Sequence, residues 1–320
     1  MTRMFTFVAT LLVSTLLLGF VGNGASNVIG IDLNSDTVKV AIVQPGQALE
    51  IVTNFQSKRK TPVAITFYKG ERMFGSDSTA LMARKPELSF AKLYRTIGRT
   101  VEHPHIQELT KQYFPYDIYA NETTTATTFK VEEAFYNSEE LVAMMLSHVK
   151  EMTASFGGKM IKDCVITVPS SFTQHEREAV YTAAEIADLN VLTLIEENTA
   201  AALHYGIDRV FEEPQTVVFY NLGAGSVQVT IATYSSYVVK EAGKNKTIGQ
   251  FEVIGKAWDS SVGGFNFDIK LAELLADRFN EAWGKKKSGV GKDLKDFVRP
   301  MTRLRIEATK VSDLLVQYSV

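Results

Sequence analysis

Two positions in this chain, each just before a turn of small residues, are suited to chemistry on an anion. Asp32 closes the apolar run 28–33, and Asn221 closes a second apolar run, 216–221. A turn rich in glycine and hydroxyl side chains lets backbone N–H groups approach phosphate, and a neighbouring carboxylate can hold hydrated Mg²⁺. The pattern therefore predicts a polyphosphate site, with Asp32 as a magnesium ligand through water.

The two segments are copies of one pattern. Residues 28–43 and 217–232 align at a constant offset (221 − 32 = 189), and each reads as strand, turn, strand. Two unrelated β-hairpins are the alternative, but a matched pair favours two similar lobes around a polyphosphate. The residues expected to contact it are Leu33, Asn34, Ser35 and Asp36 in the first turn and Gly223, Ala224, Gly225 and Ser226 in the second.

Alternating strands and helices are expected to position these turns. A capping box at Thr173 and Glu176 begins one helix, and the polar stretch 99–130 predicts a surface excursion. Strands are predicted at 28–33, 37–43, 49–53, 62–68, 163–168, 190–195, 216–221, 226–234 and 251–257. Helices are predicted at 138–156, 173–188, 198–205, 264–282 and 292–315.

Composition narrows the class of protein. The chain has 320 residues, 45% of them hydrophobic, which suffices for one large or two medium domains. A net charge of −2 gives no indication of a nucleic-acid partner. The single cysteine, Cys164, lies in an apolar run, so it forms no intramolecular disulfide and is expected to be a buried, inert thiol.

The N-terminus predicts the secretory pathway. Arg3, an apolar stretch over residues 4–21 and small residues after it are typical of a signal peptide, here residues 1–25. A transmembrane anchor is the alternative, because the stretch approaches the ~18 residues that span a bilayer. Asn121 and Asn245 begin N-x-T sequons and are predicted to be glycosylated.

The segment 163–208 resembles the heat-shock protein 70 family along its whole length. Val168-Pro169, Leu189-Asn190-Val191 and Glu197-Asn198-Thr199-Ala200-Ala201 stand where that family has the same pattern. The resemblance covers residues 28–320 and is strongest to the large endoplasmic-reticulum branch. It implies the α/β actin-like ATPase fold, with lobe I at 26–206, lobe II at 207–320 and a later nucleotide-binding element at Gly263 and Gly264.

Departures from the family pattern concern the hydrolytic groups. Asp32 and Glu197 match the family's catalytic acids, whereas Asn221 replaces a second aspartate and Tyr94 takes the place of the catalytic lysine. Asp36 places a carboxylate where a hydroxyl is expected, and it would repel phosphate unless Mg²⁺ or a lysine screens it. Loss of one such electrostatic group typically costs about 10²–10³ in rate. Nucleotide binding with weak or lost hydrolysis is therefore expected.

The resemblance implies a molecular chaperone of the endoplasmic reticulum lumen that binds ATP or ADP with Mg²⁺. Its partners would be unfolded client proteins and a smaller chaperone of the same family, on which it would assist nucleotide exchange, with no nucleic acid and no stable membrane association after signal cleavage. The alternatives are a non-catalytic interaction module and a secreted ATPase or sugar kinase on the same fold.

Lobe II is expected to be incomplete. In the family a further glycine-rich loop against the nucleotide follows, and it has no counterpart before Val320. Weak ATP binding and low solubility are the expected consequences.

Overall fold

The computed structural model describes residues 27–110, 114, 116–207, 209–241, 243–285 and 291–318. The predicted signal peptide and the apolar stretch 4–21 lie outside these residues, so both remain predictions. Within the described part of the chain, no helix combines the length and apolarity needed to cross a bilayer.

The first sheet has the order β12-β11-β1-β2-β3, and β4 pairs with β2. β1 runs parallel to β11, and β11 parallel to β12, while β1 and β2 form an antiparallel hairpin. The strands are β1 (Val28–Leu33), β2 (Thr37–Val43), β3 (Glu50–Ile51), β4 (Thr61–Pro62), β11 (Asp163–Val168) and β12 (Asn190–Glu196).

Two three-stranded antiparallel sheets and several short helices accompany the first sheet. One sheet has the order β6-β5-β7 and the other β10-β9-β8. Their strands are β5 (Ala64–Tyr68), β6 (Glu71–Phe74), β7 (Ser89–Ala91), β8 (Ile118–Ala120), β9 (Thr127–Val131) and β10 (Ala134–Asn137). The short helices are α2 (Gly75–Met82), η2 (Pro86–Leu88), η3 (Leu93–Arg95) and α3 (Pro104–Thr110).

The main core lies between the first sheet and two helices, α4 (Ser138–Gly157) and α5 (Gln174–Ile186). Alternate residues of β1 and β2 point into it, and the apolar faces of α4 and α5 close it from one side. Cys164 is fully buried in this core, as predicted, and burial raises the pKa of its thiol to about 12.

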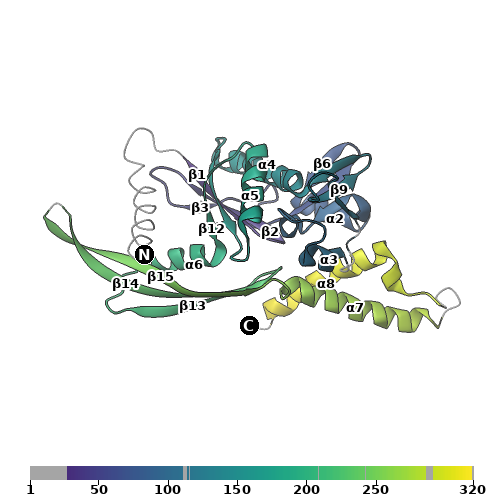
Figure 1. Cartoon of the computed structure of the whole chain (residues 1–320). Coiled ribbons are helices and arrows are strands. Elements are labelled where there is room, and N and C mark those ends of the chain that lie inside the picture. Colours follow the sequence, from purple (N-terminus) through teal and green to yellow (C-terminus); the bar gives the residue numbers. More distant parts are fainter. Residues whose placement is uncertain are drawn as a thin grey trace.

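The second sheet, β13-β14-β15, consists of β13 (Gln215–Leu222), β14 (Val227–Glu241) and β15 (Lys244–Asp259). Figure 1 shows the long β14–β15 hairpin extending away from the rest of the fold at one end. Helix α6 (Glu197–Gly206) lies between the two sheets (Figure 1), and the hydroxyl of Tyr234 on β14 donates to the Ala202 carbonyl at 2.7 Å. Helices α7 (Gly264–Trp283) and α8 (Val298–Tyr318), joined through η4 (Leu294–Asp296), pack together beyond the sheet.

Several predicted boundaries were wrong. The strand predicted at 49–53 shortens to β3, and the one at 62–68 breaks at Val63 into β4 and β5. β14 and β15 run far past the predicted 226–234 and 251–257, and the last helix begins at Val298 rather than 292. The stretch 99–130 is not wholly a surface excursion, because Thr127 and Thr128 are buried in the β8–β9–β10 sheet.

Candidate functional site

The first hairpin presents Asp32 opposite a lysine. The Asn34 N–H donates to the Thr37 carbonyl at 3.1 Å, which closes the turn. The β1–β2 register then sets Asp32 directly across from Lys39, and the Lys39 Nζ lies 3.4 Å from Asp32 Oδ2. From β11, the hydroxyl of Thr167 donates to Asp32 Oδ1 at 3.1 Å. Both carboxylate oxygens of Asp32 therefore have partners from this chain.

The second acid of the first turn, Asp36, is also paired with a lysine. Lys92 precedes η3 in a left-handed backbone conformation, and its Nζ forms a close ion pair with Asp36 Oδ1. Lys92 is buried, and its Nζ lies 4.9 Å from the centre of the Phe265 ring at the start of α7. The ammonium lowers the pKa of Asp36. Of the two cations that could screen Asp36, Mg²⁺ or a lysine, the structure supplies a lysine.

The second hairpin repeats this geometry with amides. The Gly223 N–H donates to the Ser226 carbonyl at 2.9 Å, and the β13–β14 register places Asn221 opposite Gln228. Gln228 Nε2 donates to Glu197 Oε2 at 2.7 Å, and Asn221 Nδ2 donates to the same oxygen at 3.4 Å. Asn221 and Gln228, the pair that corresponds to Asp32 and Lys39, are therefore neutral. Both amides donate hydrogen bonds to Glu197.

Glu197 begins α6, where β12 ends. Its pKa is raised to about 7, mainly by burial and further by the negative charge of Asp32, while the hydrogen bonds from Gln228 and Asn221 oppose this rise. A carboxyl group with a pKa near neutrality can accept or give up a proton at physiological pH, as a general base for water must. Its position on α6, next to the second turn, agrees with the predicted catalytic role, which remains a prediction.

Tyr94 is fully buried beside these acids. Its hydroxyl donates to the Thr167 backbone carbonyl at 2.9 Å, so Thr167 links Tyr94 to Asp32. Burial, with the nearby charges of Glu197 and Asp32, raises its pKa well above 10. Tyr94 therefore contributes a neutral phenol, not a cation, at the position predicted for the catalytic lysine.

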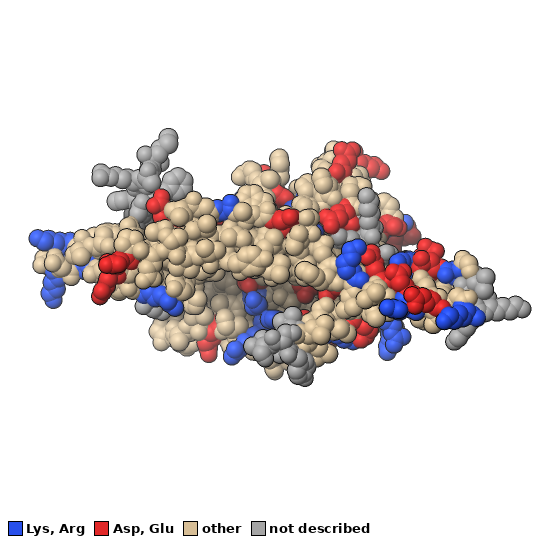
Figure 2. All heavy atoms as spheres, turned by 90° about the horizontal axis from the view of Figure 1, so that it is seen from below, with Lys and Arg blue, Asp and Glu red and all other residues tan. Residues whose placement is uncertain are grey.

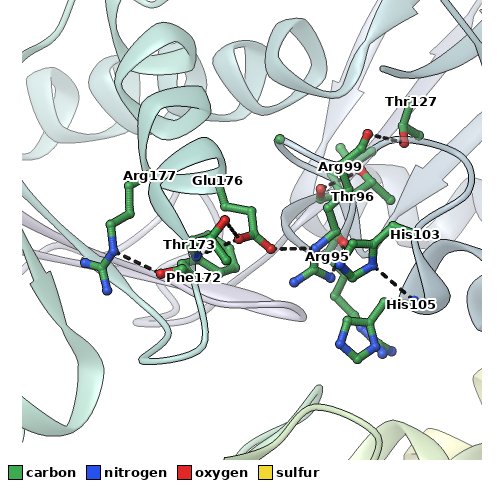
Figure 3. Close-up of polar contacts among 12 residues, drawn as sticks. Arg95, Thr96, Arg99, His103, His105, Thr127, Phe172, Thr173, Glu176 and Arg177 are labelled. Carbon is green, nitrogen blue, oxygen red and sulfur yellow. Dashed lines mark hydrogen bonds and ion pairs between the residues drawn. The ribbon is translucent and has the colours of Figure 1, made fainter. Parts of the chain in front are cut away.

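A buried ion pair fixes the segment that carries Tyr94. Figure 3 shows the Glu176 side chain between Thr173 and Arg99, and the Arg99 Nε lies 2.8 Å from Glu176 Oε1. The Thr173 N–H donates to Glu176 Oε2 at 2.6 Å within the predicted capping box, which is confirmed. Gly98 packs so closely on the start of α5 that a Cβ there would lie 2.7 Å from the Glu176 Cα. This contact docks η3 on α5 and sets the position of Tyr94.

The two turns and the Gly-Gly element converge. A Cβ on Gly225 would lie 2.5 Å from Ser35 Oγ, so the turns of the two hairpins touch. A Cβ on Gly263 would lie 2.6 Å from the Ala224 carbonyl oxygen, and the Gly264 N–H donates to the Gly223 carbonyl at 2.9 Å. Gly263 and Gly264 therefore support the second turn, and the predicted nucleotide-contacting residues meet in one place.

Further contacts join the first sheet to the β13–β14–β15 sheet behind the turns. Lys256 on β15 forms an ion pair with Glu196, and Arg95 donates to the Ser260 carbonyl at 3.4 Å. The Ser170 N–H donates to Gln228 Oε1 at 3.0 Å. These contacts hold the second hairpin against the end of the first sheet.

The two predicted glycosylation sites lie apart from the two hairpin turns. Asn121 sits in a turn after β8, where its side-chain oxygen accepts the N–H groups of Thr123 and Thr124. Asn245 is exposed near the outer end of the β14–β15 hairpin. Their modification remains a prediction.

Comparison with known proteins identifies the family. The family model described as Hsp70 protein matches residues 28–319. The chain belongs to the Hsp70 family. This membership and the mixed α/β architecture with several sheets confirm the predicted actin-like ATPase fold.

Several similar curated proteins share one name. Hypoxia up-regulated protein 1 from Danio rerio is 39% identical over 292 residues, which cover 90% of this chain and 29% of that protein. The proteins of the same name from Xenopus tropicalis and Homo sapiens are 37% and 35% identical, again over 90% of this chain, and cover 44% and 29% of their lengths. The chain therefore spans less than half the length of these relatives.

Four residues of the site were missed in the sequence. Lys39 and Gln228 could have been predicted, because counting residues outward from each turn places them opposite Asp32 and Asn221. Thr167 and Lys92 could not be predicted from local sequence. Thr167 reaches Asp32 from 135 residues away along the chain, and Lys92 is placed by a left-handed backbone conformation before η3, so both positions depend on the tertiary fold.

Lys39 competes with Mg²⁺ for Asp32, which the sequence predicts as a magnesium ligand through water. Mg²⁺ binds carboxylate oxygens and water in octahedral geometry. Here Lys39 pairs with Asp32, and Asn221 turns an N–H donor toward Glu197. No group of three or more His, Cys, Asp or Glu side chains suited to a metal occurs among the described residues.

Proposed function

We propose that this chain is a nucleotide-binding region of an endoplasmic-reticulum chaperone, which binds ATP or ADP where its two hairpin turns meet. The convergence of Ser35 and Gly225, at equivalent positions of two matched hairpins, carries the proposal. Hydrolysis is weak or lost, because Tyr94 is a buried neutral phenol and Asn221 is an amide. The sequence predicts Mg²⁺ as the companion of the nucleotide, but lysines pair with both acids of the first turn.

The broader role belongs to the same proposal. Membership of the Hsp70 family and similarity to proteins named hypoxia up-regulated protein 1 support action on unfolded client proteins under stress. Assistance of nucleotide exchange on a smaller relative is the proposed partner activity. A secreted ATPase or sugar kinase is disfavoured by the same two substitutions, at Tyr94 and Asn221.

Calorimetric titration with ATP and with ADP tests the binding role. Binding of either nucleotide, lost in Gly225→Val, supports the proposal, because a branched side chain there would collide with Ser35 and Arg95. A chain that takes up neither nucleotide but still binds denatured client protein is the non-catalytic interaction module. The neutral groups at Tyr94 and Asn221 are the observation that favours this second candidate.

The proposed location has a separate test. Protein recovered from the secretory pathway should begin near Ser26 and should lose mass on removal of N-linked glycans. An intact Met1 on cytosolic protein would contradict both the location and the glycosylation of Asn121 and Asn245.

A further inference from the structure

The two matched hairpins differ in charge at one equivalent pair of positions. Asp32 and Lys39 face each other across the first hairpin, and Asn221 and Gln228 face each other across the second, at the same offset of 189 (228 − 39). Each pair follows from an identical strand register. The first pair is a carboxylate with an ammonium, and the second pair consists of two amides.

The ammonium of Lys39 lies beside Asp32 and is partly open to solvent. Its side chain is 43% exposed and that of Asp32 is 37% exposed, so neither is sealed in the core. The next residues of β2 on either side, Val38 and Val40, are buried, so the alternation of the strand turns Lys39 to the opposite face. The lysine is thus beside the turn that is proposed to contact phosphate.

Lysines of the chain neutralise both acids of the first hairpin. Lys92 is paired with Asp36, and its position over the Phe265 ring holds it there. Lys39 is paired with Asp32, whose second oxygen accepts the Thr167 hydroxyl. A hydrated Mg²⁺ at Asp32 would have to displace Lys39 or stand beside its positive charge. At the equivalent position of the second hairpin, Asn221 offers no compensating negative charge.

We propose that the two turns bind the polyphosphate of a nucleotide without Mg²⁺ and that Lys39 is its resident cation. The inference rests on the proposed nucleotide binding and specifies the form of the ligand: free ATP or ADP, not its magnesium complex. Lys39 supplies the positive charge that the metal would bring to the phosphates. In the absence of nucleotide, the same ammonium is held by Asp32.

Calorimetric titration of the full chain with ATP, in excess MgCl₂ and in EDTA, tests this proposal. The affinity is expected to differ by less than about threefold between the two buffers. Lys39→Met removes the cation and should weaken binding in EDTA by about tenfold or more, whereas Lys39→Arg retains most of it. Lys159→Met, at an exposed position outside the cleft, is the matched control and should bind as the unaltered chain does.

Asp32→Asn distinguishes Lys39 from Mg²⁺ as the cation at the phosphates, because the two cases predict opposite changes in ATP affinity. If Lys39 is the resident cation, Asp32→Asn frees the ammonium and strengthens ATP binding in EDTA. If Asp32 instead holds Mg²⁺, the same variant weakens ATP binding in MgCl₂. Near-ultraviolet circular dichroism identifies any variant that fails to fold, and the opposite signs for Asp32→Asn and Lys39→Met cannot both come from unfolding.

The remaining outcomes are also decisive. Binding that requires Mg²⁺, or that is unchanged in Lys39→Met, overturns the inference and leaves the proposed nucleotide binding intact. No binding of ATP in either buffer overturns the proposed function together with the inference.

Discussion

At the scale of single residues, Tyr94 limits ATP hydrolysis at the candidate site. It is buried, packs against Phe172 and donates to the Thr167 carbonyl, and these contacts fix the position of its ring. A phenol cannot supply the full positive charge that would stabilise negative charge developing on a transferring phosphate.

Tyr94→Lys is expected to raise residual ATP hydrolysis by at least about tenfold, because one well-placed electrostatic group contributes about 10²–10³ in rate. Single-turnover hydrolysis of labelled ATP measures the change. Tyr94→Phe is the control: it loses the hydrogen bond to Thr167, costs about 1 kcal/mol of folding free energy and gains no activity. An unchanged rate in Tyr94→Lys, with ATP binding intact, would mean that the catalytic position lies elsewhere.

Glu197 links the stability of the fold to pH. Its pKa is raised from 4.5 to about 7, so the folded protein holds this proton more tightly than the unfolded chain between those values. The stabilisation is therefore full below 4.5, the pKa of Glu197 in the unfolded chain, and is lost as the pH rises through about 7, its pKa in the folded protein. Between about pH 5.5 and about pH 8, this group should lower the free energy of unfolding by about 2 kcal/mol.

Urea unfolding at the two pH values measures this loss, and Glu197→Gln isolates it. The amide cannot ionise, so the variant should lack this component of the pH dependence while the other titrating groups act in both proteins. Equal pH dependence in the two proteins would show that Glu197 has an ordinary pKa.

At the scale of elements, the second turn depends on close packing against the start of α7. A Cβ on Gly263 would lie within 2.8 Å of backbone atoms of both Gly225 and Ser226, which cannot move without disturbing the hairpin. Gly263→Ala should therefore lower the free energy of unfolding by about 1–3 kcal/mol and weaken nucleotide binding. Denaturant titration and calorimetry measure the two effects.

Gly255→Ala is the matched control for this substitution. Gly255 also lies in the second lobe, but a Cβ there would meet only the Ile231 side chain, at an ordinary 3.8 Å. A similar loss of stability in both variants would mean that the added methyl group itself, and not its contact with the turn, is responsible.

Elements with buried, alternating faces could be predicted from the sequence. β1, β2 and β11 match their predicted ranges, because apolar residues alternate wherever one face meets the core. β14 and β15 could not be delimited, since their outer halves are held by ladder hydrogen bonds and carry mostly exposed or half-exposed residues. The start of α8 was missed because the preceding η4 turn has helix-like composition.

The candidate site could be predicted in its backbone but not in its charges. The internal repeat located both turns, and the structure brings Ser35 and Gly225 into contact. The cations that neutralise the first turn depend on tertiary packing, since Lys92 reaches Asp36 from a segment 56 residues away. The local sequence pattern predicts strands and turns. The charges that surround a turn depend on which distant segments of the chain pack against it.

At the scale of the whole molecule, the second sheet is covered on one face and open on the other. Phe219 on β13 packs against Tyr205 of α6, so its neighbours Val218 and Tyr220 point to the opposite face. These two side chains are 58% and 68% exposed. Figure 2 shows that this face of the sheet is broad and almost without charge, whereas acidic and basic residues gather over α7 and α8.

An apolar face of this kind favours association over solubility. We expect the chain to form concentration-dependent oligomers, and the double variant Val218→Lys/Tyr220→Lys to shift them toward monomer without lowering the melting temperature. Sedimentation velocity over a concentration series measures the shift. The matched control is Leu49→Lys/Val210→Lys, which adds the same charge at two exposed apolar positions outside this face and should leave association unchanged. A chain that stays monomeric at every concentration, or a control that dissolves the oligomers equally well, would show that the β13–β15 face does not drive association.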